Sequence, residues 1–383
     1  MDPTESLEHD WPYLLSFLPE EEVLEETAKS WGALRRRRGV NSASALLRLA
    51  LAYGFCGFSL RQTAAWAEAG EIASISDVAL LNRLRKSADW LGHLLGVKLT
   101  ERLDAVPTDR TRLRLIDATT VSAPGSTGTD WRLHLDFDLG AMAISEVQLT
   151  QVSGGESLFR YEFEPGEVVV ADRGYAHRPG LAHVVDSGGQ FIVRLNPSSV
   201  PLQRPGGEAF DLLAALRGLD EAEAAGFDLE IKPDPKKGTP AVPVRLAAVR
   251  KSEQAAEQSR KKALAEASRR GKKLQPQTLE LASYVLVLTS ISAADLTAEQ
   301  ILEIYRFRWQ IELVFKRLKS LLGLGDLQAK DPDLAQAFLF AKLLGALLLE
   351  ELTHDYLSFS PWGFRLRVRT TSLPVAHSTG AAR

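Results

Sequence analysis

The stretch from Ala298 to Leu322 constrains the fold most, because it predicts a long helix with one face that must be buried. It follows the cap-like residues Asp295 and Thr297, contains no Pro or Gly, and stops before Gly323. At about 100° per residue, one face collects the apolar side chains Ile304, Phe307, Ile311, Val314, Phe315, Leu318 and Leu322. Such a helix needs a large core to pack against.

A polar stripe runs beside this apolar face. Its members fall within an arc of roughly 60°: Tyr305, Arg308, Glu312 and Lys319. A solvated charged flank is the simplest interpretation of such a stripe. The spacing itself, however, resembles the signature of bacterial insertion-sequence transposases of the IS-four family: Tyr, two residues, Arg, three residues, Glu, six residues, Lys. The resemblance implies that Glu312 is the last of three metal-binding carboxylates, after two Asp on upstream strands.

Two strand-like runs carry candidates for those Asp residues. Asp117 lies in the β-branched run Leu113–Val121, and Asp172 closes the apolar run that begins at Glu167. Asp172-Arg173-Gly174-Tyr175 resembles the second motif of the family, an Asp followed by a small residue and an aromatic one. Taken singly, each Asp also suits a turn at the end of a strand.

The order of elements predicts a mixed α/β (α+β) fold. Alternating segments at Trp131–Leu139 and 143–152 suggest an antiparallel meander with the first strand. A helix near Arg178–Asp186 and a strand at Gln190–Leu195 follow the buried strand. This order resembles the ribonuclease-H-like fold, in which the first and fourth strands are neighbours. Asp117 and Asp172 would then lie side by side at the strand ends.

The resemblance also implies roles for the residues. Phosphodiester chemistry with two divalent ions, Mg²⁺ or Mn²⁺, uses carboxylate oxygens as ligands. Asp117 would be shared by both ions, while Asp172 and Glu312 would each bind one. Arg308 and Lys319 would hold DNA phosphates, Tyr305 would contact a phosphate or support Glu312, and Arg173 would bind DNA as well. Trp309 is a candidate for stacking on a flipped base, with a core role as the alternative.

Changes in composition divide the chain. Residues 1–106 read as a helical region, in which two short helices and a basic one resemble a DNA-binding helix-turn-helix. Residues 107–196 and 282–350 form the predicted catalytic core, and 197–281 a β-rich insertion. Residues 250–273 of that insertion carry nine basic side chains against three acids and predict a projecting helix or a disordered arm. Residues 351–383 form a C-terminal tail without clear periodicity.

Composition indicates the cellular compartment in which we expect the protein. One cysteine, Cys56, excludes a disulfide framework, and the acidic N-terminus does not resemble a signal peptide. The apolar run Leu343–Leu349 is too short for a membrane span. We therefore expect a bacterial cytoplasmic protein associated with the nucleoid. A net charge of −3 means that any DNA contact depends on local basic patches, such as Arg35–Arg38.

The predicted function is DNA transposition. The enzyme would cut at the terminal inverted repeats of an element and join the freed 3′ hydroxyl to target DNA, acting as a homodimer in the DNA complex. Two alternatives remain at this stage. A metal-dependent nuclease of the same fold would share the acids, and a non-catalytic or domesticated DNA-binding protein would not need them. The sequence contains no phosphate-binding loop, nucleophile elbow or His-Glu-x-x-His zinc motif.

Overall fold

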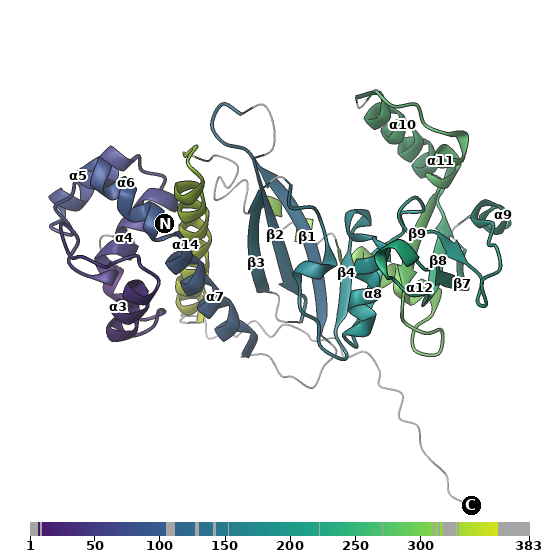
Figure 1. Cartoon of the computed structure of the whole chain (residues 1–383), viewed down its shortest axis with the longest axis horizontal. Coiled ribbons are helices and arrows are strands. Elements are labelled where there is room, and N and C mark those ends of the chain that lie inside the picture. Colours follow the sequence, from purple (N-terminus) through teal and green to yellow (C-terminus); the bar gives the residue numbers. More distant parts are fainter. Residues whose placement is uncertain are drawn as a thin grey trace, which may run out of the picture.

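A computed structural model describes residues 7, 10–104, 112–126, 130–140, 143–151, 153–221, 223–269, 271–308, 311–312, 315–316, 327 and 329–358. Three parts follow one another across the molecule (Figure 1): a group of helices around the N-terminus, a central sheet, and an outer part that ends in projecting helices. The predicted mixed α/β architecture is confirmed.

The N-terminal part is helical, as the sequence predicts. Its helices are α2 (Trp11–Leu15), α3 (Glu21–Ser30), α4 (Ala43–Gly54), α5 (Leu60–Ala69), α6 (Asp77–Lys86) and α7 (Ala88–Asp104). Serine side chains cap three of them. Ser42, Ser59 and Ser76 accept a hydrogen bond from the backbone N–H three residues ahead, which satisfies a donor that the first turn leaves free.

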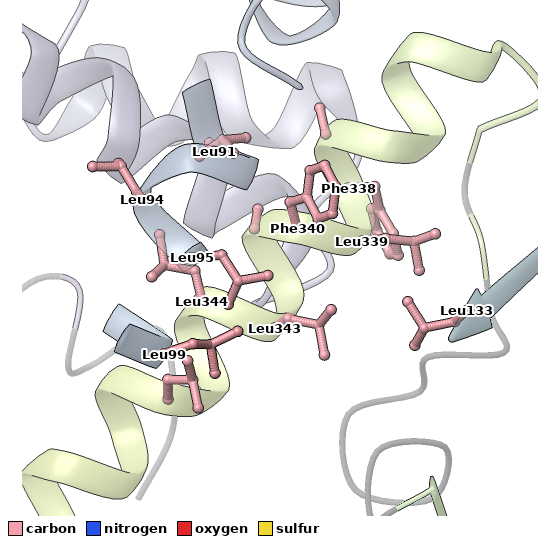
Figure 2. Close-up of a cluster of buried hydrophobic side chains, with 14 of the residues drawn as sticks. Leu91, Leu94, Leu95, Leu99, Leu133, Phe338, Leu339, Phe340, Leu343 and Leu344 are labelled. Atoms are coloured by element: carbon pink, nitrogen blue, oxygen red, sulfur yellow. The ribbon is translucent and has the colours of Figure 1, made fainter. Parts of the chain in front are cut away.

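The long helix α14 (Pro332–Ser358) completes this helical part, although it lies far along the chain. It packs against α4, α6 and α7, and Leu339 and Leu343 face Leu133 of the sheet (Figure 2). Gly54 lets α4 approach closely, since a Cβ there would lie 2.7 Å from the Cβ of Ala341. Among the described helices, the segment Pro332–Leu349 alone is long and apolar enough to cross a membrane, but 72% of it is buried inside the fold, as in a core helix.

The sheet has the order β3-β2-β1-β4-β5-β9-β8-β7-β6. The strands are β1 (Leu113–Val121), β2 (Trp131–Asp138), β3 (Ala143–Gln151), β4 (Val168–Ala171), β5 (Gln190–Arg194), β6 (Leu202–Gln203), β7 (Ala224–Ile231), β8 (Val242–Arg250) and β9 (Tyr284–Thr289). The predicted meander is confirmed by antiparallel β1-β2-β3 pairing, and β4 runs parallel to both β1 and β5. This is the predicted ribonuclease-H-like arrangement, with the first and fourth strands adjacent.

The strands of the insertion extend the same sheet. β9, at the start of the second core segment (282–350), pairs antiparallel with β5, and the insertion strands β8 and β7 continue outward from it. The basic arm is the helix α10 (Glu253–Arg269), which stands with α11 (Pro276–Leu281) beyond the ends of β8 and β9 (Figure 1). A short helix, α9 (Leu212–Arg217), and the 3-10 turn η3 (Pro235–Lys237) complete the insertion.

The sheet separates two cores, because alternate side chains of its buried strands point to opposite faces. Val170 of β4 joins the core shared with α14 and with α12 (Ala298–Arg306), while Val169 joins the opposite core. The helix α8 (Arg178–Asp186) and the 3-10 turn η1 (Leu158–Arg160) cover that opposite face. Strands buried on both faces explain the nearly continuous apolar run of β4.

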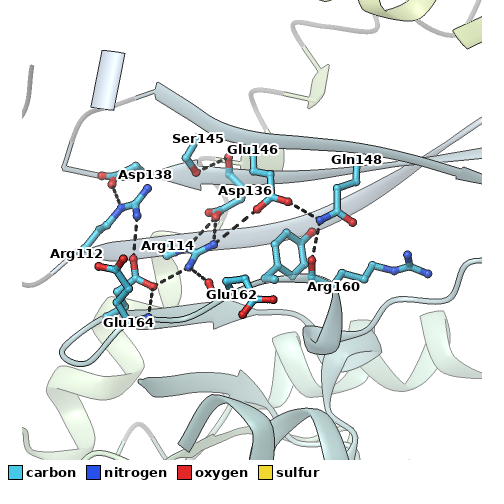
Figure 3. A network of polar contacts seen from close by, with 12 residues as sticks. Arg112, Arg114, Asp136, Asp138, Ser145, Glu146, Gln148, Arg160, Glu162 and Glu164 are labelled. Atoms are coloured by element: carbon cyan, nitrogen blue, oxygen red, sulfur yellow. Dashed lines mark hydrogen bonds and ion pairs between the residues drawn. The ribbon is translucent and has the colours of Figure 1, made fainter. Parts of the chain in front are cut away.

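A buried ionic network fixes the start of β1 against its neighbours (Figure 3). Arg114 of β1 donates to Asp136 of β2 and, at 2.7 Å, to Glu167, which immediately precedes β4. Arg112 pairs with Asp138 at 2.6 Å and with the other oxygen of Glu167 at 2.8 Å. Two arginines therefore hold three acids from adjacent strands, and this fixes their register.

Candidate functional site

Asp117 and Asp172 lie on neighbouring parallel strands. Ile116 pairs with Ala171 in the β1–β4 register, and each acid is the next residue along. Adjacent strands are about 4.8 Å apart, so the two carboxylates share one place on the sheet. Asp172 follows the end of β4, as predicted. Asp117 does not end its strand, because pairing with β2 carries β1 on to Val121, opposite Trp131.

Arg308 connects these acids to Glu312. Its Nη1 atom lies 3.8 Å from Oδ2 of Asp117, and its Nη2 atom donates to Oε1 of Glu312, one helical turn ahead. The guanidinium also lies over the ring of Tyr305, 5.8 Å from its centroid. Arg308 thus links Tyr305 and Glu312 to the strand acid Asp117. The side chain of Glu312 is 55% exposed, whereas that of Asp117 is 18% exposed.

The prediction of one uninterrupted helix from Ala298 to Leu322 is wrong, because α12 ends at Arg306. The N–H groups of Phe307, Arg308 and Ile311 bond to the carbonyl three residues back rather than four. Such 3-10 bonds advance the chain by about 120° per residue instead of about 100°. Phe307, the first residue after α12, is 46% exposed, while Ile311 and Phe315 are buried as expected.

Burial dominates the electrostatics of Asp117. It raises the pKa of Asp117 to about 6, and the nearby charges of Asp172 and Glu156 raise it further, while the Ala118 N–H and Arg308 oppose the shift. Burial also raises the pKa of Tyr305 to about 12, with Asp172 contributing in the same direction. Negative charge therefore accumulates at this point of the sheet, which favours a bound cation.

The metal ion that the sequence leads us to expect at Asp117 would bind with a pH dependence set by the raised pKa of this residue. A carboxylate must lose its proton to bind a metal ion, so Mn²⁺ should raise the melting temperature more at about pH 7.5 than at about pH 5. Without metal, the stability of the protein should change with pH in the opposite direction. An Asp whose folded pKa lies above its unfolded value of about 3.9 loses stabilisation as pH rises toward 6. Thermal melts of native protein and Asp117→Asn test this, since the variant should lose the pH dependence of the Mn²⁺ effect.

Other polar residues near the acids were not predicted from sequence. Glu156 lies against Gly174, where a Cβ would come within 1.5 Å of its Oε2 atom, and Arg132 lies 3.7 Å from its Oε1 atom. Arg194 ends β5, and Lys251 follows β8. A charged residue at the end of an apolar strand was the available signal for Arg194. Glu156 gave no signal, because its loop reaches the acids only through the fold.

Two of the residues predicted to bind DNA cannot be placed. Trp309 and Lys319 lie outside the described residues. Arg173 follows Asp172 in the 3-10 turn η2 (Arg173–Tyr175), and its backbone N–H donates to the Asp172 carboxylate at 2.6 Å. Its side chain is exposed.

Comparison with known proteins agrees with this geometry. The profile of the transposase DDE domain matches residues 108–349. The transposase for insertion sequence element IS421 of Escherichia coli is 41% identical over 359 residues, which cover 92% of this chain and 96% of that protein. The InsL protein of insertion sequence element IS186A, from Escherichia coli strain K12, has the same identity over 358 residues with the same coverage. The chain belongs to the DDE transposase family.

A more distant transposase also matches most of the chain. The transposase for insertion sequence element IS231B of Bacillus thuringiensis subsp. berliner is 22% identical over 361 residues, which cover 85% of this chain and 76% of that protein. The predicted resemblance to insertion-sequence transposases is confirmed. As a DDE transposase the protein is an enzyme of DNA transposition, and the family's chemistry depends on divalent metal ions.

Proposed function

We propose that Asp117, Asp172 and Glu312 are the three carboxylates that bind the metal ions of this transposase. The observation that carries the proposal is the juxtaposition of Asp117 and Asp172 on adjacent parallel strands, with Arg308 joining Asp117 to Glu312. The match to the transposase DDE domain covers residues 108–349, which include all three acids. These three acids match its expected order, strand, strand and helix.

The donor types fit two hard divalent ions, Mg²⁺ or Mn²⁺, because all three side chains offer carboxylate oxygens. Repulsion between Asp117 and Asp172 would be relieved by a cation between them. Within the described residues no three acidic, His or Cys side chains already converge into a metal site, and the Arg308 guanidinium pairs with two of the acids. The ions would supply an activated water or 3′ hydroxyl and stabilise charge on the phosphate and the leaving oxygen.

DNA would be held by cations around the acids. Arg308 and Arg173 border Asp117 and Asp172, and Tyr305 lies under Arg308. Arginine suits phosphate recognition through two parallel hydrogen bonds. We propose the same role for Lys319, and base stacking for Trp309. The substrates would be terminal inverted repeats and target DNA in the bacterial cytoplasm, bound by a homodimer.

We propose that the helical region 1–106 contacts DNA. The other proposed parts of the chain are the catalytic core of 107–196 and 282–350, the insertion 197–281 and the tail 351–383. Part of the basic end of α6 has an internal use. Arg83 donates to the carbonyl oxygens of Arg36 and Arg38, and Arg85 pairs with Asp331 at 2.7 Å. A DNA contact there would therefore depend on Lys86 and on the Arg35–Arg38 loop that Arg83 holds.

The deciding experiment combines the protein with Mg²⁺ or Mn²⁺, a duplex made from the DNA ends that flank its gene, and a supercoiled target plasmid. Cut ends together with joined products on a denaturing gel would support the proposal. Cutting without joining would favour a nuclease, and binding without either product would favour a regulator. A duplex of scrambled sequence is the control for end recognition.

A further inference from the structure

Three cations gather on the side of Asp172 that faces the insertion. The strands β4 and β5 are parallel, and β8 runs in the same direction as β5 because both pair antiparallel with β9. Arg173 follows β4, Arg194 ends β5, and Lys251 follows β8. The same direction of the sheet that carries Asp172 after β4 therefore also carries three positive side chains, at or just after the ends of β4, β5 and β8, with the antiparallel strand β9 between β5 and β8.

Lys251 is anchored rather than free in solvent. Its Nζ atom donates to Oγ of Ser259 at 2.9 Å and to the carbonyl oxygen of Ala282 at 2.7 Å. These bonds hold the ammonium at the junction of β8, α10 and the end of α11. Lys251 and Arg194 are both half-buried. A half-buried lysine fixed at a junction loses little further side-chain freedom when it binds a ligand.

The charges of this cluster are close enough to repel one another. Burial, followed by the charges of Arg194 and Arg173, lowers the pKa of Lys251 to about 8. Partial desolvation of the guanidinium, followed by the charge of Arg194, likewise lowers the pKa of Arg173 although much of its side chain is exposed, while Asp172 and Glu266 oppose the shift. The buried Arg114 and the half-buried Arg308 differ, because carboxylates pair directly with them. Among the described residues, no ion pair to a carboxylate is formed by Arg173, Arg194 or Lys251.

We propose that Arg173, Arg194 and Lys251 form a subsite for one phosphate of the DNA backbone, next to the catalytic acids on the side of the insertion. The inference rests on the proposed function, since it places the subsite beside Asp172. A phosphate would neutralise the mutual repulsion of the three cations. The arginines can bind it through two hydrogen bonds, and the ammonium adds a point charge. The insertion would thereby hold the substrate strand through Lys251.

The test measures the salt dependence of binding to a duplex of arbitrary sequence, with EDTA present so that no cleavage occurs. Lys251→Gln and Arg194→Gln should each weaken binding about tenfold at low salt and reduce the slope of log affinity against log salt by about one. Lys251→Arg should bind like the native protein. Lys261→Gln is the matched control, because Lys261 lies on the same arm, is 74% exposed and pairs with Glu257. Its slope should not change.

Two results would overturn the subsite. One is a native slope in both Lys251→Gln and Arg194→Gln, with circular dichroism showing that both are folded. The other is a Lys251→Arg variant that binds as weakly as Lys251→Gln, which would assign the effect to the bonds with Ser259 and Ala282 instead of to charge. Asp172→Asn separates this inference from the proposed function. It should abolish cleavage but keep the native salt slope, so a failure of either proposal is visible by itself.

Discussion

Replacing Asp172 by Asn is expected to abolish metal-dependent cutting and joining of DNA while leaving DNA binding close to native. The substitution keeps the size of the side chain and can still accept the hydrogen bond from the Arg173 N–H. It removes the negative charge that would hold a metal ion next to Asp117. A metal ion supplies several kcal/mol of transition-state stabilisation, so cleavage should fall by about a thousandfold or more. Timed cleavage of a labelled duplex with Mn²⁺, beside a binding titration, measures both properties.

The same outcome is expected for Asp117→Asn and Glu312→Gln. Asp186→Asn is the matched control, because Asp186 is an exposed acid at the end of α8. It should cut and join at the native rate. Any of the three acids whose amide variant still cleaves is removed from the proposed triad. Loss of binding together with cleavage would instead point to a structural role for that residue.

Local pattern was enough to predict the strands of the catalytic sheet, and the resemblance to the ribonuclease-H-like fold supplied their order. The β-branched run around Asp117 and the apolar run before Asp172 each favour a strand. All residues of β4 are apolar, so this strand has to be buried on both faces. The order of strands then brings the two acids together.

Contacts between distant segments were beyond such reasoning. The end of α12 at Arg306 was missed, because apolar residues spaced by three and four suit an α-helix and a 3-10 turn almost equally well. The pairing of β9 with β5 was missed too, since an apolar strand carries no mark of its partner. For the same reason the sequence does not reveal that Arg194 and Lys251 lie near each other. Their proximity depends on β4, β5 and β8 running in one direction.

The second large effect is expected far from the acids, in the buried network of Arg114. Arg114→Met should destabilise the fold by about 3–5 kcal/mol, because it leaves the buried carboxylate of Asp136 without its ion-pair partner. The side chain of Arg114 is 5% exposed and that of Asp136 is 0% exposed. A loss of that size is a large part of the about 5–15 kcal/mol that holds a typical domain together. Thermal and urea denaturation, followed by circular dichroism, should show a marked loss of stability or an unfolded protein.

Charge, rather than lost packing, is the expected cause, and a second substitution tests this. Glu167 keeps Arg112 as a partner at 2.8 Å when Arg114 is removed. The energetic penalty of an unpaired buried charge therefore falls mainly on Asp136. Arg114→Met combined with Asp136→Leu should therefore recover much of the stability, because an apolar pair can replace a buried ion pair. Arg217→Met is the matched control, since Arg217 makes two hydrogen bonds to Glu280 at the surface. Its melting temperature should stay near native. A double variant as unstable as Arg114→Met would show that shape, not charge, makes Arg114 necessary at the start of β1.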